Sequence, residues 1–215
     1  MMQTPRRHFW LLSAGLALGA FALATAAGAQ PLAGPALIAA LRGGGYVLLM
    51  RHASSPRTPP DPAAADKANV APERQLDDAG RASARAMGEA LASLRIPIGR
   101  VLSSPTYRAL ETIRLARLGQ PTVAAELGDG GQSMQAGAVA SSADWLRRKI
   151  AEAPPAGANT IIVTHFPNIA SVFGDQAQGL ADGEALVLRP DGKGAAPLVA
   201  RVKIEQWPLL ARSSP

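Results

Sequence analysis

Short, uninterrupted apolar runs punctuate this 215-residue chain. The two clearest are Tyr-Val-Leu-Leu-Met over 46–50 and Thr-Ile-Ile-Val-Thr over 160–164, and a weaker run covers 100–102. Runs of this length without polar alternation are typical of strands that are buried on both faces, as in parallel sheets. A further short strand is predicted at 122–124. Two more, at 183–189 and 198–204, flank an Asp-Gly turn.

Segments with a helical pattern lie between these strands. They are predicted at 35–42, 79–94, 105–116, 141–150 and 167–173. The regular alternation of strands and helices predicts an α/β fold, namely a three-layer α/β/α sandwich around a mostly parallel central sheet.

Two of the predicted helices carry clear local signals. The helix over 79–94 is capped by Asp77 or Asp78, and four positions at intervals of four predict its buried face: Ala82, Ala86, Ala90 and Leu94. In the next helix, Ser104 is predicted to be the N-cap residue, with Pro105 at the first helical position.

The N-terminus follows a different pattern. Arg6 and Arg7 precede an uncharged run over 11–27, and Ala-Gly-Ala at 27–29 offers a cleavage site. This predicts a signal peptide over 1–29 and a single domain over 30–215, in the periplasm or secreted. The Arg-Arg-x-Phe pattern at 6–9 resembles a twin-arginine signal, and a Sec signal is the alternative. The run is short and glycine-rich, so no stable membrane anchor is expected after cleavage.

Composition narrows the possible functions. The chain has no cysteine, which excludes disulfides and thiolate chemistry. The formal net charge is +6, and the Lys and Arg residues form no block. Aromatic residues make up only 4% and are not interleaved with the arginines, which argues against a nucleic-acid groove. A basic pocket for a phosphorylated small molecule fits this composition better.

Two histidines stand at positions where ligands bind in α/β proteins. Of the three in the chain, His8 lies in the predicted signal peptide, whereas His52 and His165 each directly follow a predicted buried strand. The carboxyl ends of parallel strands form the ligand-binding edge of such sheets. His52 is also preceded by Arg51, which suits an anionic substrate.

Several kinds of active site are disfavoured by the motifs. A zinc site would need a third protein ligand, and the chain has neither cysteine nor an HExxH motif. No GxSxG elbow is present, and no GxxxxGK[ST] or GxGxxG loop follows a strand. What remains is a histidine nucleophile in an arginine-rich pocket that stabilises oxyanions.

Four motifs, in order, resemble the histidine phosphatase superfamily, which includes the cofactor-dependent phosphoglycerate mutases and the phosphohistidine phosphatases. They are Arg51-His52-Ala53, Leu-Asp-Asp-Ala-Gly-Arg at 76–81, Ser-Ser-Pro-Thr-Tyr-Arg-Ala-Leu-Glu-Thr at 103–112 and Val-Thr-His at 163–165. The resemblance covers roughly residues 46–189. It implies a phosphoglycerate mutase-like fold and a phosphomonoesterase that needs no metal or cofactor.

The resemblance also implies roles for individual residues. His52 would attack phosphorus and form a phosphohistidine. Arg51 and Arg108 would bind phosphate oxygens, because a guanidinium can donate two parallel hydrogen bonds. His165, protonated or as a donor, would stabilise the charge that develops on the phosphoryl group. Arg57, with Asp61 in the same proline-rich loop, is predicted to contact the substrate.

The chain departs from the family pattern at three points. Ala53 replaces the usual glycine, and the loop after it lacks the Thr and Asn of mutase-like members, which disfavours mutase activity. Phe166 follows His165 in place of an aspartate, which argues against the phytase and acid-phosphatase branch. The first candidate for the general acid is Glu184, which precedes a predicted strand, and the second is Glu126.

Three alternatives to a phosphomonoesterase stay open from the sequence. The first is a non-catalytic phosphate- or phosphosugar-binding protein that retains the pocket. The second is a protein-phosphohistidine phosphatase, and the third is a hydrolase with a metal held by two histidines.

Overall fold

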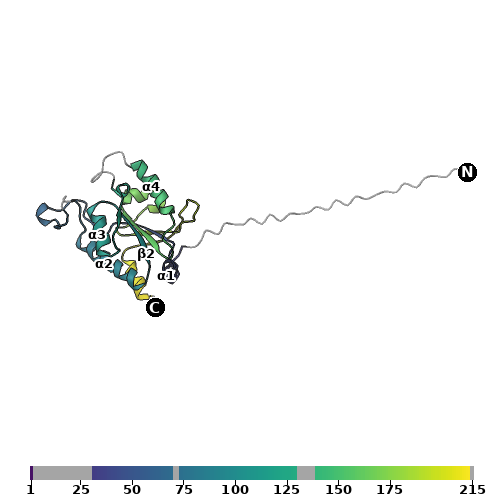
Figure 1. Cartoon of the computed structure of the whole chain (residues 1–215), viewed down its shortest axis with the longest axis horizontal. Coiled ribbons are helices and arrows are strands. Elements are labelled where there is room, and N and C mark those ends of the chain that lie inside the picture. Colours follow the sequence, from purple (N-terminus) through teal and green to yellow (C-terminus); the bar gives the residue numbers. More distant parts are fainter. Residues whose placement is uncertain (2–30, 70–72, 130–138, 214–215) are drawn as a thin grey trace.

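A central sheet organises the computed structural model, which describes residues 1, 31–69, 73–129 and 139–213. Within these residues the sheet has six strands in the order β3-β2-β4-β1-β5-β6. Figure 1 shows the sheet, with β2 labelled, between the surrounding helices. The strands are β1 (Val47–Arg51), β2 (Ile98–Ser103), β3 (Thr122–Val123), β4 (Asn159–Thr164), β5 (Ala185–Leu188) and β6 (Leu198–Val202). Neighbouring strands among β3, β2, β4 and β1 are parallel, β5 is antiparallel to β1, and β6 is antiparallel to β5, which confirms the predicted mostly parallel sheet.

Helices cover both faces of the sheet. One hydrophobic cluster joins it to α1 (Gly34–Gly43), α2 (Asp78–Ser93), α3 (Tyr107–Leu115) and α6 (Gln206–Ser213). A second cluster joins the other face to α4 (Val139–Ala151) and α5 (Phe166–Phe173). Three single turns complete the elements: η1 (Pro62–Ala64), η2 (Ala125–Leu127) and η3 (Gly174–Ala177). The predicted three-layer sandwich is therefore confirmed.

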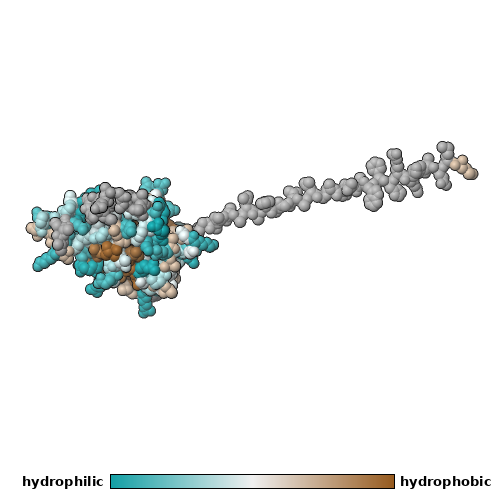
Figure 2. All heavy atoms as spheres, turned by 45° about the horizontal axis from the view of Figure 1, so that its top comes forward, coloured by the Kyte–Doolittle hydropathy of each residue, from teal (hydrophilic) through white to brown (hydrophobic). Residues whose placement is uncertain are grey.

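The strands are buried on both faces because successive side chains of a strand point to opposite sides. In β1, Leu48 and Met50 belong to the first cluster, whereas Val47 and Leu49 belong to the second. The surface is mostly polar in the view of Figure 2, with an apolar area near its centre. Most apolar side chains are therefore buried in the two hydrophobic clusters, one on each face of the sheet.

Two local predictions were wrong in part. The buried face of α2 consists of Gly80, Ala84, Met87, Ala90 and Leu91, and Leu94 behind it is also buried, whereas Ala82 is exposed. Alanines occur on every side of this helix, so the larger side chains decide which face packs.

Helix α3 begins two residues later than predicted, at Tyr107, and Ser104 does not cap it. Instead the Tyr107 amide donates to the Glu73 carboxylate at 3.0 Å. Helix α2 follows its prediction, because Asp77 is its cap and accepts from the Gly80 amide at 2.6 Å.

The C-terminal helix α6 was not predicted. Pro208 in its first turn obscures the helical pattern, and its buried Trp207 joins the first cluster beside α2. The predicted signal peptide lies outside the described residues, apart from Met1. No helix in the described part of the chain is both long and apolar enough to cross a membrane.

Candidate active site

The register of the sheet brings the two strand-end histidines together. Strands β1 and β4 are parallel neighbours, and Arg51 pairs with Thr164. The residues that follow, His52 and His165, therefore meet at the same edge, with the His52 amide donating to the Thr164 carbonyl at 3.0 Å. Their ring centroids are 5.2 Å apart, and both side chains are buried.

The contacts of His52 fix its tautomer. Its Nδ1–H donates to the Ala53 carbonyl at 2.8 Å, and its Nε2 accepts from Nε of Arg108 at 3.2 Å. Burial lowers the pKa of His52 to about 3, with further lowering by Arg108 and Arg51. The ring is therefore neutral at physiological pH, and its unprotonated Nε2, which accepts from Arg108 in the free protein, carries the electron pair that a nucleophile needs.

His165 has the opposite tautomer. Its Nδ1 lies 3.1 Å from Nη2 of Arg108, and a guanidinium can only donate, so Nδ1 accepts. The remaining Nε2–H then donates to Oγ of Ser104 at 2.8 Å. Burial, followed by the charge of Arg108, lowers the pKa of His165. In the free protein His165 is thus neutral, and Ser104 orients it instead of capping a helix.

Arg108 is the centre of the site. It is only 2% exposed, and besides both histidines its guanidinium contacts Asp129, whose Oδ2 lies 2.7 Å from Nη2. Thr112, one turn along α3, donates to the Arg108 carbonyl and accepts from the Ala53 amide at 3.1 Å. The Ala53 amide is therefore used within the protein, and Thr112 ties the segment after β1 to α3.

Arg51 reaches the site from the end of β1. Its Nη2 forms an ion pair with Asp182 at 2.6 Å, and its Nη1 donates to the Leu180 carbonyl at 3.2 Å. Its Nε is buried and has no hydrogen-bond partner among the described residues. Arg51 is therefore held in place at its tip and retains a donor for a ligand.

These side chains line one small cavity of about 200 Å³. Its lining residues are Arg51, His52, Arg74, Arg108, Asp129, His165, Phe166 and Pro167. Pockets for drug-sized ligands usually span about 300–1,000 Å³, so this one suits a phosphoryl group whose ester substituent extends through the mouth. Arginines and neutral histidines make it a site for an anion.

Two lining residues were missed by the sequence interpretation. Arg74 donates to the carbonyls of Pro56 and Ser55 at 2.6 and 3.1 Å, and burial, then Arg108, lowers its pKa. It directly precedes the motif that begins near Leu76, and that position could have drawn attention to it. Asp129 follows a glycine in a loop, and no local pattern marks it.

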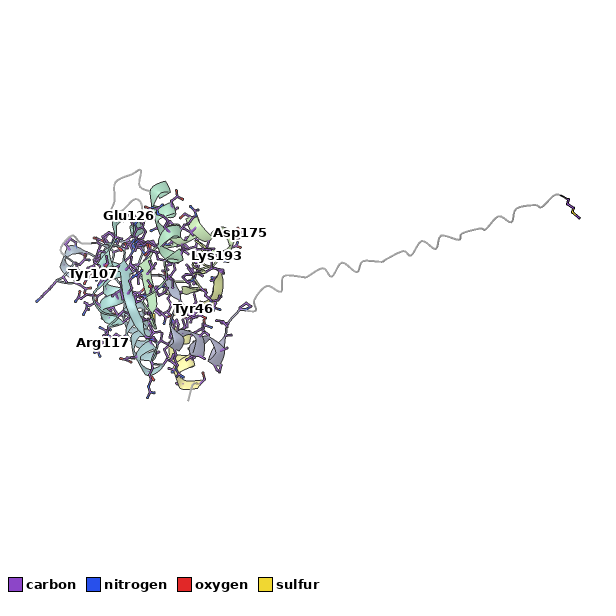
Figure 3. All side chains as sticks on the ribbon, turned by 45° about the vertical axis from the view of Figure 1, so that its right-hand side comes forward. Tyr46, Tyr107, Arg117, Glu126, Asp175 and Lys193 are labelled. Carbon is purple, nitrogen blue, oxygen red and sulfur yellow. The ribbon has the colours of Figure 1, made fainter. Side chains whose placement is uncertain are left out.

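Four residues proposed from the sequence do not line the cavity. Arg57 is exposed, and Asp61 accepts from the Ala63 amide as the cap of η1. Glu126 is partly buried in η2, near the carboxyl end of the sheet, whereas Tyr46 marks the amino end of β1 (Figure 3). Glu184, the first candidate for the general acid, also lies outside the lining.

Glu184 is buried and engaged elsewhere. Its carboxylate accepts from Nε of Arg201 at 2.7 Å and from the Ala181 amide at 2.9 Å. Burial raises the pKa of Glu184, but the hydrogen bonds from Arg201 and Ala181 outweigh it and the pKa is lowered. An ionised carboxylate outside the cavity has no proton to give to a leaving group, so its contacts do not support the role of acid.

The described residues hold no group of three or more His, Cys, Asp or Glu side chains that could bind a metal ion. The chemistry that these residues can supply themselves is anion binding by three arginines and attack by one histidine. The candidate nucleophile His52, the cationic groups and a carboxylate all come from the carboxyl ends of β1 and β4, from α3 and from adjoining loops.

Comparison with known proteins gives one match to a family model. A sequence model of the histidine phosphatase superfamily (branch 1) matches residues 47–138. No match was found among curated proteins.

The fold recurs among solved structures. The protein histidine phosphatase SixA complexed with tungstate superposes with a TM-score of 0.54 and 20% identity, over 75% of this chain and 98% of that one. A candidate phosphohistidine phosphatase SixA from Nakamurella multipartitia gives 0.51 and 21%, over 73% and 94%. A phosphoserine phosphatase mutant from Entamoeba histolytica gives 0.48 and 12%, over 74% and 98%. At these identities the first two superpositions show a shared fold.

Proposed function

We propose that the chain, whose residues 47–138 match a sequence model of the histidine phosphatase superfamily (branch 1), is a metal-independent phosphomonoesterase of that superfamily that acts through a phosphohistidine on His52. One observation carries the proposal. The Nδ1–H of His52 is held by the Ala53 carbonyl, so that the free electron pair of Nε2 stands beside the Arg108 guanidinium in an anion pocket.

Binding of the substrate would use the cationic side chains. Arg51, Arg74 and Arg108 neutralise the phosphate dianion, and guanidinium donors match the geometry of its oxygens. The same donors stabilise the charge on the equatorial oxygens as the phosphoryl group transfers, which is where most catalysis of this reaction arises. His165 is held beside Arg108 and fills one wall of the pocket.

The chemistry would proceed in two displacements. Nε2 of His52 forms a bond to phosphorus while the bond to the ester oxygen breaks, and the alcohol leaves. Water then attacks phosphorus, the N–P bond breaks, and inorganic phosphate is released. The backbone acceptor on Nδ1 stabilises the positive charge that the ring carries in the intermediate.

The phosphohistidine gives a direct test of this function. Brief reaction with a 32P-labelled aryl phosphate, followed by denaturation in alkali, should leave label on a peptide that contains His52, and acid should remove it. The result should not change in the presence of a chelator. Binding of phosphate without any label would instead indicate a phosphate-binding protein, and loss of activity with the chelator would indicate a metal hydrolase.

We further propose that the protein is exported, on the strength of the charged start, apolar run and small-residue site over 1–29. Expression in a bacterial host should yield a periplasmic form whose intact mass corresponds to a chain beginning at Gln30. Replacing Arg6 and Arg7 by lysine should stop export only if the twin-arginine route is used. A full-length cytosolic product would contradict export.

A further inference from the structure

The reaction needs a proton for the leaving alcohol, and one carboxylate is placed to give it. Among the described residues that line the cavity, Asp129 is the single acidic side chain. It is 9% exposed and lies in the loop after η2. The two glutamates favoured by the sequence, Glu184 and Glu126, do not line this cavity.

One guanidinium connects Asp129 to the nucleophile. The Nη2 of Arg108 lies 2.7 Å from Oδ2 of Asp129, and the Nε of the same group lies 3.2 Å from Nε2 of His52. A phosphoryl group that is bound by Arg108 in front of His52 is therefore close to the Asp129 carboxylate. A proton donor must come within hydrogen-bond reach of the oxygen that it serves, and Asp129 is the acidic side chain among the described residues that lies in the same cavity and shares Arg108 with His52.

The loop that carries Asp129 is fixed by the elements that carry His165. Oγ of Thr164, at the end of β4, donates to the Leu127 carbonyl at 2.8 Å. The amide of Asn168 in α5 donates to the Leu127 and Gly128 carbonyls at 3.0 and 2.6 Å. Both groups are buried, so the position of the peptide before Asp129 is set by side chains on either side of His165.

We propose that Asp129 is the general acid of the reaction and that it takes up its proton as the phosphate group binds. This inference rests on the proposed phosphatase function. In the free protein the Arg108 ion pair favours the ionised carboxylate. A bound phosphate dianion competes for the donors of Arg108 and places like charge beside Asp129, which favours the protonated carboxyl.

Two further titratable side chains among the described residues act on Asp129. His165 and Arg74 interact electrostatically with Asp129. His165 is held neutral by its contacts, and Arg74 is bound to the carbonyls of Ser55 and Pro56. Of the described charges beside Asp129, the one that ligand binding adds is therefore that of the phosphate next to Arg108.

The proton balances over the two displacements. In the first, the electron pair of the breaking P–O bond goes to the ester oxygen, which takes the proton of Asp129 and leaves as an alcohol. In the second, the Asp129 carboxylate removes a proton from water while the water oxygen attacks phosphorus. The N–P bond breaks, and its electron pair returns to Nε2 of His52. Asp129 is then protonated again.

The dependence of activity on the leaving group distinguishes a general acid at Asp129 from a residue with a structural role only. In Asp129→Asn, kcat/KM for an alkyl phosphate such as glycerol phosphate should fall by about 10²–10⁴-fold, the usual contribution of a general acid. For p-nitrophenyl phosphate, whose leaving group needs no proton, the fall should be below about tenfold. Asp144→Asn, an exposed acid on α4, is the matched control and should change neither value.

Two outcomes would overturn the assignment. One is an equal loss on both substrates in Asp129→Asn, and the other is a leaving-group-dependent loss in Glu126→Gln instead. Failure of the proposed function is distinguishable, because Asp129→Asn should still form the phosphohistidine from p-nitrophenyl phosphate. If neither protein is labelled, the phosphatase function itself is wrong.

Proton uptake gives a second measurement that needs no turnover. Tungstate is a dianion that does not titrate near neutral pH. Calorimetric titrations with tungstate at pH 7, repeated in buffers of different ionisation enthalpy, should show that the protein takes up about one proton for each ion bound. Asp129→Asn and Asp129→Ala should bind tungstate without that uptake. Equal uptake in the original protein and both variants would contradict protonation at Asp129.

Discussion

Replacement of His52 by alanine should lower kcat/KM for an aryl phosphate by about 10⁴-fold or more. The Nε2 of His52 is the neutral, oriented nitrogen that faces the anion pocket, and removal of the nucleophile removes the covalent route altogether. Hydrolysis of p-nitrophenyl phosphate under steady-state conditions measures the loss. Tungstate affinity reports separately whether the arginines still form the anion site.

The matched control is His165→Gln, since an amide nitrogen can preserve the hydrogen bond to Ser104. This variant retains the nucleophile, so it should lose less activity than His52→Ala and should still be labelled on His52. Hydrolysis by a correctly folded His52→Ala at a rate near the original would refute the assigned nucleophile. Loss of tungstate binding in that variant would instead indicate collapse of the pocket.

The meeting of His52 and His165 could be predicted from the sequence because it depends on sheet geometry. Both follow buried apolar runs, and the carboxyl ends of parallel strands lie at one edge of the sheet. That β1 and β4 are direct neighbours, although β2 and β3 lie between them in the chain, is a finding of the structure. The carboxyl ends of these strands then coincide, whatever the loops do. Arg108 was identified through the motif around it, and the structure places it between the two rings.

Asp129, the proposed general acid, and Arg74, the third arginine of the cavity, could not be predicted in the same way. Asp129 and Arg74 reach the cavity from loops, where position depends on tertiary contacts such as the hydrogen bonds of Asn168 to the Leu127 and Gly128 carbonyls. Glu184 looked suitable because it adjoins a strand next to the site, but its partner Arg201 lies on another strand. Sequence spacing does not reveal such cross-strand pairing.

The same histidines should make the stability of the fold depend on pH. Burial, then the charge of Arg108, lowers the pKa of both rings, that of His52 to about 3, whereas an unfolded chain has histidines near 6.5. Below pH 6.5 the unfolded state therefore binds more protons than the folded state. The free energy of unfolding should decrease as pH falls from about 6.5 towards 3, by about 1.4 kcal/mol per pH unit for each histidine.

Urea unfolding of the protein and two amide variants at several pH values measures this contribution. In His52→Asn the side-chain amide can replace Nδ1–H as a donor to the Ala53 carbonyl, and in His165→Gln it can replace Nε2–H as a donor to Ser104. Neither amide titrates, so each variant should lose about 2 kcal/mol less than the original protein between pH 6.5 and pH 5. Carboxylates titrate alike in all three proteins and cancel in the comparison. If the free energy of unfolding changes with pH in the same way in all three proteins, the folded histidines have ordinary pKa values. The prediction that His52 stays neutral at acidic pH would then be wrong.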